Sequence, residues 1–123
     1  MVQSEIHHIA LNVADVNETK NFYSRFFSLN EVQRPSDRPN SGVWLVAKDG
    51  RQIHLRKGKV PEDNGQHLAF LVADIHEACR NLTTAGVNVT TPVPIGTSLQ
   101  AFLHDPSGNR VEIHQLENSD TDH

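Results

Sequence analysis

The chain has 123 residues, of which 37% are hydrophobic and 21% charged, and its formal net charge is -4 with histidine neutral. This size and balance suit one globular domain, and the lack of a basic stripe argues against nucleic acid or an acidic membrane as a partner. No apolar run is long enough to span a bilayer, the N-terminus does not resemble a signal peptide, and the single cysteine, Cys79, fits a reducing cytoplasm.

The first predicted strand, "HIALNVAD", starts at His8 and returns 59 residues later as "HLAFLVAD", starting at His67. Five of the eight positions are identical between the two copies. An amphipathic segment follows each copy and predicts a helix, with Asp15 and Asp74 at the N-cap positions. Gly86 is expected to end the second helix. The repeat therefore predicts two similar modules.

Each half of the chain ends in two short predicted strands around a turn. The segments are "VWLVAKDGRQIHLRKG" and "QAFLHDPSGNRVEIHQ", and "KDG" and "DPSGN" are strong turn signals. Four residues after the turn glycine lies His54 in the first half and Glu112 in the second. The two halves therefore match at a second point beyond the repeated strand.

Each half is predicted to be a β-α-β-β-β module, in an α+β fold. The modules cover about 5–57 and 66–116 of a single domain over 1–116, and 117–123 is expected to be a disordered acidic tail. Loops are expected at 37–42 and at 58–65, the second of which links the halves.

Strand alternation places four of the residues above on a common kind of face. Because successive side chains point to opposite faces, the apolar residues of each strand form one face, which can pack on a helix. His8, His54, His67 and Glu112 fall on the other face of their strands. Three imidazoles and one carboxylate suit one divalent ion, and Ni, Zn, Co, Mn and Fe(II) all remain possible.

Simpler interpretations of these residues also remain open. A single histidine in a strand is usually packed or exposed, and a glutamate near a strand end is usually solvated. The alternation assigns His7 to the apolar side, which favours a structural role, and His76 lies on a helix and is expected to be solvated. His104 and His114 lie on faces that could open on a cavity. The metal hypothesis rests on the equivalent positions of the four residues in the repeat.

The chain resembles the vicinal oxygen chelate superfamily, which includes glyoxalase I, fosfomycin-resistance proteins and extradiol dioxygenases. The resemblance covers roughly residues 5 to 116. It rests on "HHIALNVADVNETKNFYSRFF", "RQIHL", "QHLAFLVADI" and "FLHDPSGNRVEIHQ", and the DPxGNxxE pattern of the last is quite specific. It implies that the modules form a curved, incompletely closed mixed sheet around a metal.

The resemblance also implies a ligand set and a type of chemistry. The implied ligands are His8, His67 and Glu112, often with a fourth at His54, and the substrate is a small molecule chelated through neighbouring oxygens. A homodimer is common among such single-chain members. In a glyoxalase-like lyase or isomerase, the metal would hold the two oxygens of a hemithioacetal and stabilise an enediolate. Glu112 would be the catalytic base that moves a proton between adjacent carbons.

Six further residues are expected to contact the substrate. In glyoxalase I the position of Asn12 is commonly an arginine that serves the glutathione carboxylate, and Arg56, Arg110 or Lys57 could take that part here. Trp44 and Phe102 could line a small hydrophobic pocket. The expected substrate residues are Asn12, Trp44, Arg56, Phe102, His104 and Arg110.

Three alternative functions remain within the same resemblance. A fosfomycin-resistance-like thiol transferase would use the set His8, His67 and Glu112 to polarise an epoxide. An Fe(II) extradiol-type dioxygenase would use two histidines and one carboxylate, with His54 as a possible acid or base. A drug-binding protein would need no catalytic metal, and the four-residue set speaks against it.

Overall fold

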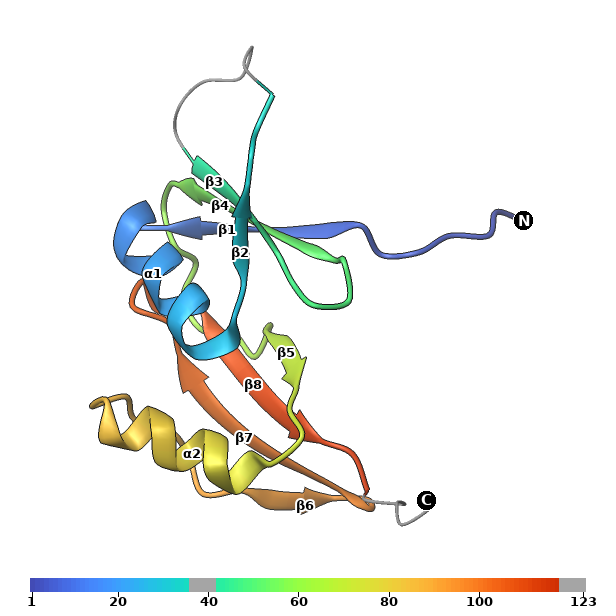
Figure 1. The fold of residues 1–123 in the computed structure, drawn as a ribbon, viewed down its shortest axis with the longest axis vertical. Helices are drawn as coiled ribbons and strands as arrows, with labels where there is room; N and C mark the ends of the chain where they lie inside the picture. The colour runs from blue at the N-terminus through green and yellow to red at the C-terminus, as the bar shows by residue number, and fades with distance from the viewer. Residues whose placement is uncertain (36–41, 118–123) are drawn as a thin grey trace. The chain divides into compact units, whose positions relative to one another are not determined.

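The computed structural model describes residues 1–35 and 42–117 (Figure 1). The loop expected at 37–42 and the tail expected at 117–123 lie outside this part of the chain, apart from Gly42 and Glu117. Neither helix in the described residues is long and apolar enough to cross a membrane. In chain order the elements are β1 (His8–Val13), α1 (Val16–Phe27), β2 (Asn30–Val32), β3 (Gly42–Val46), β4 (Gln52–Lys57), β5 (Leu68–Leu71), α2 (Ile75–Thr84), β6 (Val93–Ile95), β7 (Ser98–His104) and β8 (Arg110–Gln115).

The chain divides into two compact units. The N-terminal unit comprises Met1–Glu62 together with Pro106–Asn109, and the C-terminal unit comprises Asp63–Asp105 together with the chain from Arg110 onward. Each unit has the predicted β-α-β-β-β order, with one helix and one four-stranded mixed sheet that does not close into a barrel. The predicted fold class is thereby confirmed.

The first and last strands of each module are parallel neighbours. The strand order is β1-β4-β3-β2 in the N-terminal unit and β5-β8-β7-β6 in the C-terminal unit. The β1–β4 and β5–β8 pairs are parallel and the remaining pairs are antiparallel. A parallel pair needs a long crossover connection, which each helix provides. The last strand consequently lies between the strand that opens the module and the strand that precedes it.

Both helices begin, and α2 ends, where their sequences predict. Asp15 accepts a hydrogen bond from the backbone N–H of Glu18, and Asp74 accepts from two N–H groups of the first turn of α2. These carboxylates satisfy donors that have no partner within the helix. Gly86 follows the end of α2 with φ +88, a conformation that glycine adopts without strain. Ser28 ends α1 with φ 57, which no sequence signal had indicated.

Each unit has a small apolar core between its helix and one face of its sheet. Helix α1 packs on β3 and β4, and α2 packs on β7 and β8. On the strands whose faces the sequence assigned, the buried apolar side chains all lie on the predicted apolar face, so the alternation is confirmed for those strands. The N-terminal core includes Val13, Phe22, Tyr23, Leu45, Ile53 and Leu55, and the C-terminal core includes Ile75, Leu82, Ala101, Leu103, Val111 and Ile113.

The "DPSGN" turn has a structural role in the N-terminal unit. The Ser107 hydroxyl accepts a hydrogen bond from the Ala14 backbone N–H at 2.9 Å and shares a second one with the Thr19 hydroxyl at 2.8 Å. The Asn109 side chain donates to the Asn12 carbonyl at 3.0 Å. Thr19 is fully buried. The turn therefore ties the end of β1 to the first turns of α1.

Replacing Ser107 by alanine should lower the free energy of unfolding by about 1–2 kcal/mol, because the buried Thr19 hydroxyl and the Ala14 N–H each lose a partner. Urea unfolding monitored by circular dichroism measures the change. Ser24→Ala is the control, on the helix α1 that also carries Thr19. It should not lower the free energy of unfolding, since alanine favours helix. Equal stability of Ser107→Ala and the parent would contradict this role of the turn.

Candidate metal centre

In the N-terminal unit, His54 lies at the middle of the sheet between a small and a large neighbour. The parallel register places Ala10 of β1 beside His54, and the antiparallel register places Trp44 of β3 on its other side. The Trp44 and His54 rings are stacked, with centroids 4.1 Å apart and an interplanar angle of 3°. His54, an expected ligand, is therefore in direct contact with Trp44, an expected substrate residue.

The His8 ring stacks on His54 as well. Its centroid lies 4.0 Å from that of His54, at an interplanar angle of 11°. Ala10 has only a methyl group, so the space beside His54 is open to the His8 ring. His7 is exposed rather than packed on the apolar side, and its Nδ1 lies 2.9 Å from Nδ1 of His8. The structure thus brings together the two expected ligands of this unit and corrects the expectation for His7.

His54 is held as a neutral imidazole. The pKa of His54 is lowered from 6.5 to about 4, chiefly by burial and in addition by the nearby His8, His7 and Arg34. The Gln52 side-chain oxygen accepts a hydrogen bond from Nε2 of His54 at 2.9 Å. This bond places the proton on Nε2 and leaves Nδ1 with a lone pair, which is the form of imidazole that binds a metal.

In the C-terminal unit, Glu112 has the same kinds of neighbours as His54. The parallel register places Ala69 of β5 beside Glu112, and the antiparallel register places Phe102 of β7 on its other side. An alanine and an aromatic residue therefore flank the equivalent position in both modules. This match supports the second half of the repeat, in which His54 corresponds to Glu112.

Glu112 is buried, with 6% of its surface exposed, although a glutamate near a strand end is usually solvated. Both carboxylate oxygens have imidazole partners. Oε1 lies 2.9 Å from Nε2 of His67, and Oε2 lies 2.6 Å from Nδ1 of His114. His114, which the sequence placed on a face that could open on a cavity, contacts the expected base directly.

His67 is oriented by a backbone carbonyl. It lies immediately before β5, and its Nδ1 donates a hydrogen bond to the Gly65 carbonyl at 2.8 Å. Histidines that bind metals commonly donate their other ring N–H to such an acceptor, which fixes the tautomer. Nε2 of His67 is thereby the nitrogen available for an ion.

The nearest ligand atoms of His67 and Glu112 are separated by a hydrogen-bond distance. Two ligands that lie at right angles, each about 2.1 Å from an octahedral ion, are separated by about the same distance. Nε2 of His67 and Oε1 of Glu112 lie 2.9 Å apart. Across residues 1–35 and 42–117, no group of three or more His, Cys, Asp or Glu side chains is arranged to hold a metal. Each unit contributes one pair of expected ligands, and their joining stays a prediction.

Asp63 was not among the residues expected from the sequence, yet it binds two of the expected substrate residues. Oδ2 of Asp63 accepts from Nε2 of His104 at 2.8 Å and from Nη1 of Arg110 at 3.2 Å. Arg110 also lies over the Phe102 ring, 4.4 Å from its centroid. The signal in the sequence was the "DNG" turn of the linker, four residues before His67. That pattern predicts a turn but does not show which side chains the carboxylate reaches.

The remaining expected substrate residues lie near the end of β4. The Asn12 side chain donates to the Lys59 carbonyl at 3.0 Å and fills the space beside Gly58, where a Cβ would lie 3.1 Å from it. Asn12 thus holds the chain as it leaves β4. Arg56 is exposed on the same strand.

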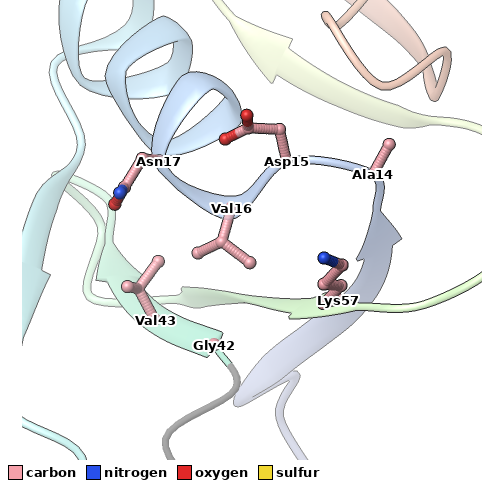
Figure 2. A pocket seen from close by; sticks show the side chains of 7 residues that line it. All are labelled: Ala14, Asp15, Val16, Asn17, Gly42, Val43 and Lys57. Atoms are coloured by element: carbon pink, nitrogen blue, oxygen red, sulfur yellow. The ribbon is translucent and has the colours of Figure 1, made fainter.

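A hollow in the N-terminal unit lies at the other end of β1 from His8 (Figure 2). Ala14 lies six positions after His8, which is about 20 Å along a strand at 3.3 Å per residue. The hollow contains none of the expected ligands or substrate residues. Its lining residues are Ala14, Asp15, Val16, Asn17, Gly42, Val43 and Lys57.

Comparisons with known proteins identify relatives along most of the chain. A family model described as "Glyoxalase/Bleomycin resistance protein/Dioxygenase superfamily" matches residues 5–113. The lactoylglutathione lyase of Haemophilus influenzae is 28% identical over 131 residues, which cover 95% of both chains. The "Probable lactoylglutathione lyase" of Vibrio parahaemolyticus is 30% identical, over 94% of this chain and 93% of the relative.

Solved structures share the fold at lower identity. A mutant of the fosfomycin resistance protein FosX from Listeria monocytogenes, complexed with Mn(II) and dihydroxypropylphosphonic acid, has a TM-score of 0.81 and 22% identity over 98% of both chains. TnmS3, an antibiotic binding protein from a Streptomyces species, has a TM-score of 0.79 and 21% identity over 95% of this chain and 99% of its own.

The hydrogen bonds to Asp63 should be visible in its titration. The hydrogen bond from His104, with those from Gly65 and Arg110, lowers the pKa of Asp63 from 3.8 to about 2. Because the pKa of Asp63 is lower in the folded state, its carboxylate stabilises the fold. This stabilisation is fully present above about pH 4 and is lost as the pH falls through about 2. Carboxyl 13C NMR should give this value in the parent and a higher one in His104→Ala. His76→Ala is the control, and an unchanged pKa in His104→Ala would contradict the assignment.

Proposed function

The chain belongs to the glyoxalase/bleomycin resistance protein/dioxygenase superfamily, and from that premise we propose that it is a divalent-metal-dependent enzyme of the lyase or isomerase type. Its substrate is a small molecule that binds the metal through two adjacent oxygens. The observation that carries the proposal is the buried Glu112, whose two oxygens face His67 and His114. The names of the lactoylglutathione lyase relatives support this reaction class.

The proposed ligands are His8, His54, His67 and Glu112. His54 is neutral with its Nδ1 lone pair available, and His67 is oriented by the Gly65 carbonyl. A bound divalent ion acts as a Lewis acid that holds and polarises the substrate oxygens. Its identity among Ni, Zn, Co, Mn and Fe(II) does not follow from these ligand types.

Glu112 is the proposed base. It removes a proton from one carbon of the bound substrate and returns the proton to the neighbouring carbon, so that the product is an isomer of the substrate. Its burial removes competing water, and the bond from His114 holds one oxygen of the carboxylate in place. A base must be fixed within hydrogen-bond reach of the proton that it moves, and His114 helps to fix the position of the Glu112 carboxylate.

The expected substrate residues divide by their contacts. Trp44 and Phe102 flank His54 and Glu112, and we assign them to the apolar walls of the substrate site. Arg56 is exposed and can reach an anionic group of the substrate. Protein partners already bind Asn12, His104 and Arg110. A substrate must therefore either displace these partners or pack against the side chains as they stand.

Two broader features belong to the same proposal. We propose a cytoplasmic homodimer, in line with the single cysteine and with the common assembly of similar single-chain proteins. Exposed Leu71 and Leu116 of the C-terminal unit are apolar side chains that a second copy could cover. Sedimentation equilibrium of the tag-free protein measures the assembly.

The parent protein should bind about one divalent ion per chain, and replacing any one of the four ligands by alanine should weaken binding by at least tenfold. Plasma mass spectrometry measures metal content for His8→Ala, His54→Ala, His67→Ala and Glu112→Ala. The only tryptophan, Trp44, lies against His54, so Co(II) should also quench its emission. His76→Ala, exposed on α2, is the matched control.

Absence of metal from the parent after supplementation with Ni, Zn, Co, Mn and Fe(II) would contradict the proposal and favour a binding protein. Full metal content in His54→Ala alone would instead indicate a three-ligand site. That result would favour the thiol-transferase or dioxygenase alternatives.

Glu112→Gln should lower kcat by about 10²–10⁴-fold, because the amide cannot accept the proton while its oxygen can still bind the metal. The assay uses the hemithioacetal of methylglyoxal and glutathione, in D₂O, with mass spectrometry of the lactoylglutathione product. Deuterium at the carbon that receives the proton reports exchange at the base. Metal content is measured alongside, so that loss of the base and loss of the metal are separated.

Epoxide opening by a thiol, or cleavage of a catechol ring, in place of this isomerisation would identify one of the alternative reactions. Asp49→Asn, at an exposed turn, serves as the activity control.

A further inference from the structure

Asp63, in the linker between the modules, binds three groups of the C-terminal unit. It belongs to the exposed segment "GKVPEDNG", which the sequence identifies only as a loop. Its carboxylate nevertheless accepts three hydrogen bonds, from the Gly65 N–H, the His104 ring and the Arg110 guanidinium. A single exposed ion pair contributes little to stability, but three donors on one carboxylate restrict the position of every group involved.

The first connection from Asp63 to His67 runs through the turn. Oδ1 of Asp63 accepts from the Gly65 N–H at 3.0 Å, and Gly65 has φ +94, which glycine adopts without strain. The Gly65 carbonyl then accepts from Nδ1 of His67 at 2.8 Å. Asp63 therefore holds Gly65, the residue whose carbonyl orients the imidazole.

The second connection runs through Arg110 and Phe102. Oδ2 of Asp63 accepts from Arg110 at 3.2 Å, which holds the guanidinium over the Phe102 ring at 4.4 Å. The edge of the Phe102 ring meets the His67 ring, with centroids 5.3 Å apart and an interplanar angle of 86°. His104 binds the same oxygen at 2.8 Å and prevents it from turning away.

We propose that Asp63 is a positioning residue, which fixes the His67 imidazole through the Gly65 carbonyl at Nδ1 and through the Arg110–Phe102 stack at the ring. Nε2 of His67 is consequently directed at Glu112, 2.9 Å away. That Nε2 is a metal ligand rests on the proposed function, whereas the orientation of the ring does not. Arg110 and His104 then act mainly through Asp63.

The test compares three variants of the full-length chain. Asp63→Ala removes both connections. Asp63→Asn keeps an oxygen for the Gly65 N–H but loses the charge that binds Arg110 and His104. Asp49→Ala is the matched control, because Oδ1 of Asp49 also accepts from the backbone N–H two residues later, at 3.0 Å, in the N-terminal unit.

The first measurement is the 15N signal of His67 Nδ1 in the metal-free protein, assigned with His67→Gln. In the parent and in Asp49→Ala, the signal should lie in the range of a protonated nitrogen. In Asp63→Ala it should move toward the average of two exchanging tautomers, and in Asp63→Asn it should lie between. An unchanged signal in Asp63→Ala would overturn the proposal.

The second measurement is the affinity for Zn(II), by calorimetric titration, together with the thermal midpoint of each variant. Loss of a group that orients a ligand weakens metal binding by about 10–100-fold. Asp63→Ala should show a loss in this range, Asp63→Asn a smaller loss and Asp49→Ala none, with thermal midpoints close to that of the parent. Equal Zn(II) affinities in the parent and Asp63→Ala would overturn the role of Asp63.

The two measurements separate the possible failures. A parent that binds no Zn(II) or other divalent ion would remove the proposed function, while the 15N signal still decides whether Asp63 orients His67. Asp63→Ala could bind Zn(II) more weakly only because its thermal midpoint is lower, with the 15N signal of His67 unchanged. That result would indicate a structural role and would also overturn the proposal. Asp63→Asn retains the turn, so it provides a folded variant if Asp63→Ala does not fold.

Discussion

The parallel pairing of the first and last strands of each module is the constraint on which the candidate site depends. It places the last strand next to the opening strand and fixes the register that sets Ala10 beside His54 and Ala69 beside Glu112. A change of one residue in that register would turn these side chains to the other face, toward the helix. The repeated alanine leaves room on one side of each expected ligand, and an aromatic ring from the antiparallel neighbour closes the other side.

The two modules use this common frame for different chemistry. His54 is kept neutral by burial and by the charges near it, and it is stacked between Trp44 and His8. Glu112 is buried with an imidazole at each oxygen. A neutral lone pair and a carboxylate are both ligands for a divalent ion, and only the carboxylate is also suited to accept a proton from carbon. The proposed role of Glu112 as the base, beside its role as a ligand, follows from that difference.

The exposed linker joins the two modules and also positions side chains of the C-terminal unit. Because Asp63 binds the turn before His67 as well as Arg110 and His104, the orientation of one expected ligand depends on a residue outside every strand. Loops carry such roles when a rigid sheet holds the groups that they contact. The "DPSGN" turn has a comparable structural part, since Ser107 satisfies the buried Thr19 hydroxyl and the Ala14 N–H.

Local pattern alone determined the modules, the caps Asp15 and Asp74 and the faces on which His8, His54 and Glu112 lie, because helix ends and strand alternation depend on neighbouring residues. Only the tertiary structure decided that Glu112 is buried between two imidazoles and that Asp63 reaches His104, 41 residues away, and Arg110, 47 residues away. Such contacts depend on strand register and on the closure of loops, which no local pattern encodes. The sequence therefore indicates which residues share a face, and the fold decides which of them touch.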